Sequence, residues 1–274
     1  MAQCTQTFIL VRDGKQETIP CGKCINCKKR RISAWSFRLV EEDKISSSSS
    51  FITLTYDSIN VPLTEKGYMN LCKRDLQLFF KRLRKRNKNK IKYYACGEYG
   101  GKTDRPHYHI ILFNADIETI QESWGKGQVH YGKVSEASVG YTLKYICKES
   151  KIPKHKNDDR QKEFPLMSKG MGKNYLSNQM INWHKADLSE RMYCNLKDGK
   201  KITMPRYYKE KMYTEEEKQH IKQKSIEKIQ KQELEIWKNI KTPQEQALRI
   251  SLKKQRIIKN IEILKNEEKN RNKI

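Results

Sequence analysis

Residues 105–113, Arg-Pro-His-Tyr-His-Ile-Ile-Leu-Phe, carry the strongest signal of fold and chemistry in this sequence. Side chains alternate between the two faces of a strand, so His107 and His109 share one face and Tyr108 takes the other. The β-branched and aromatic run over 110–113 predicts a strand that continues into a hydrophobic core. Two imidazoles side by side on a rigid strand suit a metal ion, although two partly exposed, non-functional histidines would give the same pattern.

The segments around this strand predict an α+β domain with a central antiparallel sheet and packed helices. Phe51–Tyr56 and Tyr93–Gly97 have strand composition, and the second lies close enough to 105–113 to form an antiparallel hairpin. An amphipathic helix is predicted over 71–86, with apolar positions spaced i, i+3, i+4 and i+7. These positions are Leu76, Phe79, Phe80 and Leu83. Strands that pair antiparallel with helices between them indicate one domain over 32–185.

Weaker signals complete this domain. Ser33 is expected to cap a helix that ends near Asp43, and a further strand is expected over 129–134. Helices are also expected over 116–124 and 135–148. The serine run 46–50 is expected to be an exposed loop.

The chain after residue 185 differs in character. A connecting segment, 186–213, leads to a basic helical extension, 214–274. Thr214–Glu217 and Thr242–Glu245 both fit the capping box, so helices are expected over 215–241 and from 243 to about 270. A solvated structural appendage and a dedicated partner site both remain open for this extension.

The charge of the chain favours polyanionic partners. The 274 residues hold 57 Lys and Arg against 32 Asp and Glu, a formal net charge of +25. Such an excess favours nucleic acid, through counterion release at phosphates, although a generally Lys-rich composition would explain part of it. No secretory or membrane-spanning segment is evident, so we expect a soluble, intracellular protein with no membrane partner.

The N-terminal segment, 1–31, is rich in cysteine. Cys21, Cys24 and Cys27 are each separated by two residues, and Cys4 could supply a fourth ligand to a structural Zn²⁺. Buried thiols and an iron–sulfur cluster are the alternatives. The basic run that follows would then be anchored for DNA contact; it consists of Lys28, Lys29, Arg30 and Arg31. The remaining cysteines, which are dispersed, are expected to be core residues: Cys72, Cys96, Cys147 and Cys194.

The helix predicted over 135–148 carries a second group of reactive side chains. Tyr141 and Tyr145 are four residues apart and therefore share a helix face. Lys144 and Lys148 lie beside them, and the opposite, buried side holds Val139, Leu143 and Ile146. A phenol becomes a useful nucleophile when a metal polarises the electrophile and cations favour the phenolate. Two half-buried structural tyrosines are the alternative.

Three of these segments together resemble the HUH endonucleases, the rolling-circle replication initiators and relaxases. Their motifs occur here in order, as Phe51–Tyr56, Pro106–His109 and Tyr141–Tyr145. The cysteine segment, Gly97–Gly100 and Ser168–Gly172 are similar to the replication initiation proteins of the Microviridae, of the gokushovirus kind. The resemblance covers about residues 1–185.

This resemblance implies a mechanism and a ligand set. Mg²⁺ or Mn²⁺ would sit on His107 and His109, with Glu98 as the third ligand; a loop-exposed carboxylate is the alternative for Glu98. Tyr141 or Tyr145 would nick single-stranded DNA at a rolling-circle origin, leaving a 5′-phosphotyrosine and a free 3′-hydroxyl, and the strand would later be rejoined. Lys144 would neutralise phosphate charge or assist proton transfer, and Lys148 would contact DNA.

The resemblance also implies a setting. The protein would act in the cytoplasm of an infected bacterial host, on a single-stranded DNA origin and with host replication machinery. Two rival interpretations remain. One is a plasmid initiator or relaxase with the same chemistry; the other is a non-catalytic, zinc-stabilised DNA-binding protein whose histidines and tyrosines only pack.

Overall fold

The protein is described here from a computed structural model, which covers residues 4–12, 14–101, 103–135, 139–140, 142–143, 152–196, 199–238 and 242–271. The chain divides into two compact units. Unit 1 comprises 1–28, 178–195 and 203–274, and unit 2 comprises 29–177 and 196–202. Each unit is treated separately below.

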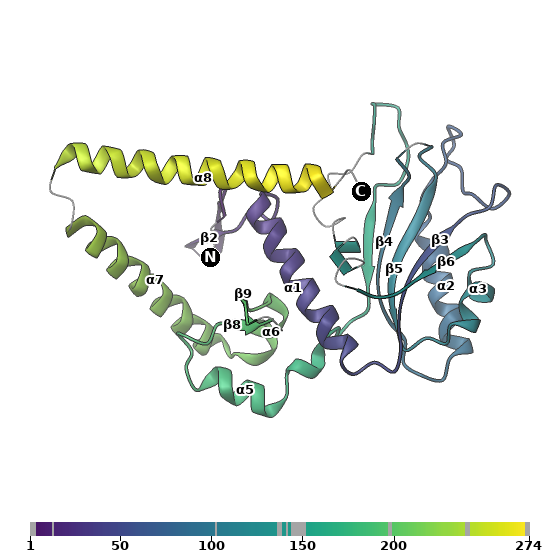
Figure 1. Ribbon diagram of the computed structural model, residues 1–274, viewed down its shortest axis with the longest axis horizontal. Coiled ribbons are helices and arrows are strands. Elements are labelled where there is room, and N and C mark those ends of the chain that lie inside the picture. Colours follow the sequence, from purple (N-terminus) through teal and green to yellow (C-terminus); the bar gives the residue numbers. More distant parts are fainter. Residues whose placement is uncertain are drawn as a thin grey trace. The chain divides into compact units, whose positions relative to one another are not determined.

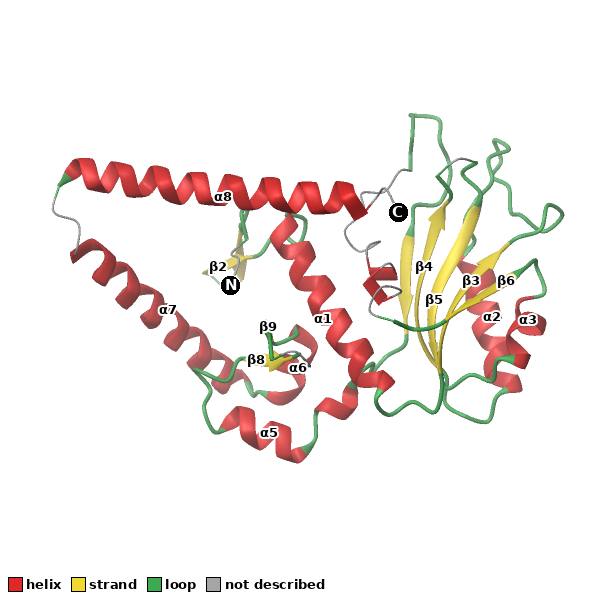
Figure 2. Ribbon diagram, viewed as in Figure 1, coloured by secondary structure: helices red, strands yellow, loops and turns green. Residues whose placement is uncertain are grey.

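Unit 2 is built on a five-stranded antiparallel sheet in the order β6-β3-β5-β4-β7, seen in Figures 1 and 2. The strands are β3 (Ser49–Thr55), β4 (Lys92–Tyr99), β5 (Pro106–Phe113), β6 (Val129–Gly132) and β7 (Phe164–Met167). The predicted hairpin is present: β4 pairs antiparallel with β5, so that Glu98 lies opposite His107. On the other side of β5, β3 places Thr53 opposite His109. The fold class predicted from the sequence is therefore confirmed.

One face of the sheet is covered by two helices, α2 (Lys73–Arg86) and α3 (Glu118–Trp124), as Figure 1 shows. The predicted apolar stripe of α2 is buried, with Leu76, Phe79 and Leu83 fully inaccessible to solvent. Burying side chains of this size contributes about 1.5–3 kcal/mol each. Gly97 belongs to this tightly packed face, because a Cβ there would approach the Leu71 side chain to 3.0 Å.

The opposite face carries the histidines and has a core of its own. Leu39 and Trp35 of α1 (Ile25–Asp43) pack there against Ile111 and Phe113 of β5. Val139, Leu143 and Met171 join the same cluster. Because Ile111 and Phe113 share the strand parity of His107 and His109, this second core lies on the histidine-bearing face.

Two local expectations were wrong. Helix α1 begins at Ile25, directly after Cys24, so Ser33 lies inside the helix and does not cap it. The Lys and Arg residues at 28–31 are good helix formers, and Lys28 N–H already donates to the Cys24 carbonyl at 2.9 Å. The serine run is also not all loop, since Ser49 and Ser50 pair with Phe113 and Leu112 in the sheet. Pairing outweighs the weak strand preference of serine.

Unit 1 begins with a hairpin that the sequence did not predict, formed by β1 (Phe8–Arg12) and β2 (Lys15–Ile19). Its helices are α5 (Asn178–Lys185), α6 (Arg206–Met212), α7 (Glu215–Lys238) and α8 (Pro243–Arg271). The remaining short elements of the chain are η1 (Lys173–Tyr175), β8 (Tyr193–Asn195) and β9 (Lys201–Thr203).

The capping boxes predicted for the C-terminal helices are confirmed. Glu217 N–H donates to Thr214 Oγ1 at 3.2 Å, and Thr214 N–H donates to the Glu217 carboxylate at 2.8 Å. Thr242 and Glu245 repeat the pattern at the start of α8. No helix within the described ranges is long and apolar enough to cross a membrane.

Candidate metal and nucleophile site

Three candidate ligands come together on the hairpin of β4 and β5. Glu98 lies directly opposite His107 in the ladder, and His109 follows two residues along on the same face. Glu98 Oε2 is 3.4 Å from His107 Nε2 and 3.4 Å from His109 Nε2. The ligand atoms of all three residues lie within 4.8 Å of one another.

The second ring nitrogen of each histidine is held by a neighbouring group. His107 Nδ1 lies 3.2 Å from the Arg105 carbonyl, which can only accept, so Nδ1 carries the proton and Nε2 keeps its lone pair. His109 Nδ1 lies 3.0 Å from Thr53 Oγ1. A metal-binding histidine usually donates its other N–H in this way, which sets the tautomer and the ring orientation. Both rings are therefore oriented for binding through Nε2.

Glu98 is not a loop-exposed carboxylate. It lies within β4, only 6% exposed, and His109 is equally buried. Two imidazole nitrogens and one carboxylate oxygen, rigidly held on two strands, form a donor set that suits Mn²⁺ and, through the carboxylate, Mg²⁺. The residues present thus fit a divalent cation, and three protein ligands leave coordination positions for water or substrate.

Sequence reasoning missed Thr53 as a supporting residue. It belongs to the predicted strand 51–56, and strand alternation puts it on one of two faces. Which of those faces carries the histidines depends on how β3 pairs with β5. The register Thr53↔His109 supplies that information.

The segment with the candidate nucleophiles is only partly described. Val139 and Leu143, predicted to face the core, are 6% and 0% exposed and pack on the histidine-bearing face. Thr142, which precedes Leu143, is also fully buried. Tyr141, Lys144, Tyr145 and Lys148 lie outside the described residues. The part of this segment that is described therefore packs on the same side of the sheet as the candidate ligands.

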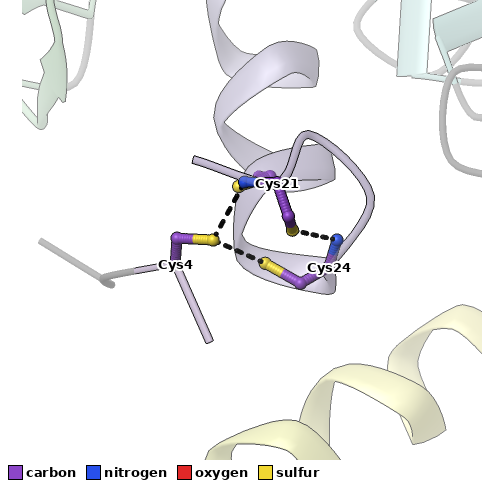
Figure 3. A group of neighbouring side chains, drawn as sticks. Cys4, Cys21 and Cys24 are labelled. Atoms are coloured by element: carbon purple, nitrogen blue, oxygen red, sulfur yellow. Dashed lines mark hydrogen bonds between the residues drawn. The ribbon is translucent and has the colours of Figure 1, made fainter. Parts of the chain in front are cut away.

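A second cluster lies in unit 1, where Cys4, Cys21, Cys24 and Cys27 bring their sulfurs within 4.8 Å of one another. Figure 3 shows the sulfurs of Cys4 and Cys24 turned toward each other, and the two atoms are 3.8 Å apart. With Zn–S bonds of about 2.3 Å, a tetrahedral site separates its sulfurs by about 3.8 Å. The cysteine spacing and the geometry therefore fit a tetrahedral metal.

Backbone N–H groups in this cluster favour thiolates. Cys24 N–H donates to Cys21 Sγ at 3.1 Å, and Cys21 N–H donates to Cys4 Sγ at 3.3 Å. Burial acts to raise the pKa of the Cys24 thiol, but backbone N–H donors at Thr5 and Cys27 outweigh it and lower that pKa to about 5. Burial raises the pKa of Cys27 to about 12. A bound cation would be required to ionise all four thiols together.

The other predicted positions fall into three groups. The basic residues 28–31 lie in the first two turns of α1, directly after the cysteine cluster in sequence. Cys96 and Cys194 are buried, as expected for core residues, whereas Cys72 is half-buried. Cys147 lies outside the described residues.

Comparison with known proteins identifies the relatives of this chain. Residues 49–150 match the family model of the replication-associated protein ORF2. The chain is similar to phage replication-associated proteins. It is 29% identical over 222 residues to replication-associated protein ORF2 of Spiroplasma virus 4, an alignment that covers 73% of this chain and 69% of that protein.

Two further relatives are of the same kind. Replication-associated protein VP4 of Bdellovibrio phage phiMH2K is 27% identical over 217 residues, covering 70% of this chain and 66% of that protein. Replication-associated protein ORF4 of Chlamydia phage 1 is 24% identical over 222 residues, covering 70% of this chain and 53% of that protein. No solved structure gives a significant match. The resemblance to microvirus replication proteins that the motifs indicated is thus confirmed, and it supports a role in starting replication.

Proposed function

We propose that this protein nicks single-stranded DNA at a rolling-circle origin through a tyrosine nucleophile and later rejoins the strand. The observation that carries the proposal is the cluster of Glu98, His107 and His109, which falls within the region matched by the replication-associated family. The buried residues Val139 and Leu143 support it, because they attach the tyrosine-bearing segment to the same face of the sheet.

The proposed reaction exchanges one phosphodiester for another. The phenol oxygen of Tyr141 or Tyr145 attacks the scissile phosphorus, and the bond from phosphorus to the 3′ oxygen breaks. The phenol gives up its proton, and the departing 3′ oxygen takes one up. The products are a 5′-phosphotyrosine and a free 3′-hydroxyl. Because the ester bond is retained, the reverse attack by a 3′-hydroxyl rejoins the strand without another energy source.

Each residue has a proposed part in this reaction. Glu98, His107 and His109 would hold Mg²⁺ or Mn²⁺, which when bound polarises the phosphate oxygen. The Arg105 carbonyl and Thr53 would keep the two rings in the binding orientation. Lys144 is proposed to neutralise phosphate charge or to assist proton transfer. The presence of both Tyr141 and Tyr145 allows successive cleavages by alternating nucleophiles.

The cysteine cluster is proposed to be a structural zinc site, since four thiolates without an open position are typical of such sites. Residues 32–185 are proposed as the endonuclease domain, and 214–274 as a basic helical extension. Lys28, Lys29, Arg30, Arg31 and Lys148 are proposed to contact DNA, in the cytoplasm of an infected bacterium and alongside host replication proteins. The fourfold cysteine cluster favours a microviral initiator over a plasmid initiator or relaxase.

A covalent-adduct assay tests the proposal. The full-length protein is incubated with Mn²⁺ and labelled single-stranded oligonucleotides that tile the candidate origin. We expect an adduct that survives denaturation and a product with a free 3′-hydroxyl. The variant with Tyr141→Phe and Tyr145→Phe together should form none, whereas Tyr131→Phe, at an exposed tyrosine of β6, should behave as wild type. If the double variant still forms the adduct, or wild type forms none, the protein is a DNA-binding protein of another kind.

A further inference from the structure

One cation beside the metal site has no part in the chemistry described so far. Arg105 lies immediately before β5, two residues from His107, and is half-buried. Its guanidinium donates to the Tyr56 carbonyl at 2.7 Å. Tyr56 follows Thr55, which lies opposite His107 in the sheet. The guanidinium is therefore anchored to the end of β3 beside the first histidine.

Among the described residues, no carboxylate forms an ion pair with Arg105. The nearest acidic residue in sequence, Asp104, is instead paired with Lys154 and Arg160. A half-buried guanidinium without a counterion has a desolvation cost that protein contacts do not offset. Apart from the bond to Tyr56, its donors make no hydrogen bond to any described residue, so the planar fork can still bind an anion through two N–H groups.

The backbone of the same residue is already committed to the site. The Arg105 carbonyl accepts from Gly100 N–H at 2.9 Å and lies 3.2 Å from His107 Nδ1. The position of the guanidinium relative to His107 is consequently held at both ends, by this carbonyl and by Tyr56. Such a preorganised cation is what an anionic group next to the ligands would require.

We propose that Arg105 binds a backbone phosphate of the single-stranded substrate, at or next to the scissile position. This inference rests on the proposed nicking function and extends it to substrate positioning. The ligand class follows from the chemistry: a bidentate guanidinium suits a phosphodiester, and a nearby carboxylate, Glu98, disfavours any anion that is not drawn in by a cation.

Three variants test the inference: Arg105→Gln, Arg105→Lys and a charge-matched control, Lys85→Gln. Lys85 is exposed on α2, which covers the opposite face of the sheet. Binding of a labelled oligonucleotide is measured by anisotropy in EDTA at about 50–200 mM KCl, a range where lost phosphate contacts change the salt slope. Single-turnover nicking with Mn²⁺ at saturating DNA is the second readout. Mn²⁺ affinity without DNA reports whether the ligand site is intact, since the variants keep the Arg105 backbone.

Loss of one phosphate contact should lower the salt slope of Arg105→Gln by about 0.7 and leave that of Lys85→Gln unchanged. Nicking by Arg105→Gln should fall at least about tenfold, and Arg105→Lys should restore binding better than nicking, because lysine lacks the bidentate fork. Unchanged Mn²⁺ affinity excludes damage to the metal site. Arg105→Gln that binds and nicks like Lys85→Gln overturns the inference. A wild type that binds DNA with the expected slope difference but forms no adduct refutes only the nicking function.

Discussion

The hydrogen bond between Thr53 and His109 allows a direct test of the metal site. Thr53→Val keeps the β-branched shape and the strand preference but removes the hydroxyl that faces His109 Nδ1 at 3.0 Å. Removal of such an outer-shell partner usually costs 10- to 100-fold in metal affinity, or about 1.4–2.8 kcal/mol. Because Thr53 offers a neutral hydroxyl and not a carboxylate, we expect about tenfold weaker Mn²⁺ binding, close to the 0.5–1.5 kcal/mol of a neutral hydrogen bond.

The same strand supplies a matched control. Thr55 lies two residues further on the same face, but its hydroxyl donates to the Gln128 carbonyl at 3.2 Å and not to a histidine. Thr55→Val therefore makes the same chemical change without touching a ligand. Mn²⁺ affinity is measured by calorimetric titration of both variants and wild type. If Thr53→Val and Thr55→Val bind Mn²⁺ equally well, the support of His109 by Thr53 is refuted.

Three further predictions concern stability and the second metal site. Glu42→Ala should lower the free energy of unfolding by about 3–5 kcal/mol, because this carboxylate is 1% exposed and pairs with a lysine of β4 at 2.7 Å. A loss under about 1 kcal/mol in urea titrations would contradict a buried pair. Cys24→Ser should lose bound zinc in elemental analysis while Cys96→Ser, outside the cluster, retains it; equal zinc contents would argue against the site. For Asp104, the ion pair with Lys154 holds the pKa below its usual 3.8, so its stabilisation is present above that pH and is lost as pH falls through the lower folded pKa. Asp104→Asn should therefore show a shallower fall in Tm between about pH 5 and 2, and identical slopes would count against this pair.

Local signals in the sequence were sufficient for most elements. The apolar spacing of α2, the composition of β3 and β5 and the two capping boxes all act within a few residues, so each can be recognised without knowledge of the fold. By contrast, β7 has only four residues, Phe164–Met167, and owes its strand conformation to pairing with β4. The β1–β2 hairpin was missed for a similar reason, because its pairing is the main evidence for it.

The candidate site shows the same division. Strand alternation alone placed His107 and His109 on one face, and the cysteine spacing alone grouped Cys21, Cys24 and Cys27. Cys4 could be named only as a fourth ligand by type, and the structure brings its sulfur to the others. Glu98 likewise could be a turn residue or a ligand until its position in the ladder was known.

By itself, the sequence determined the chemistry available to this protein: two imidazoles on one strand face, a thiol cluster, and tyrosines at helical spacing. These follow from the periods of the helix and the strand, which are properties of the local chain. Only the tertiary structure decided which groups act together. Glu98 lies opposite His107, and Thr53 opposite His109, because the register among β3, β4 and β5 is set by the packing of both faces of the sheet. A shift of one residue would turn these side chains to the other face and dismantle the site.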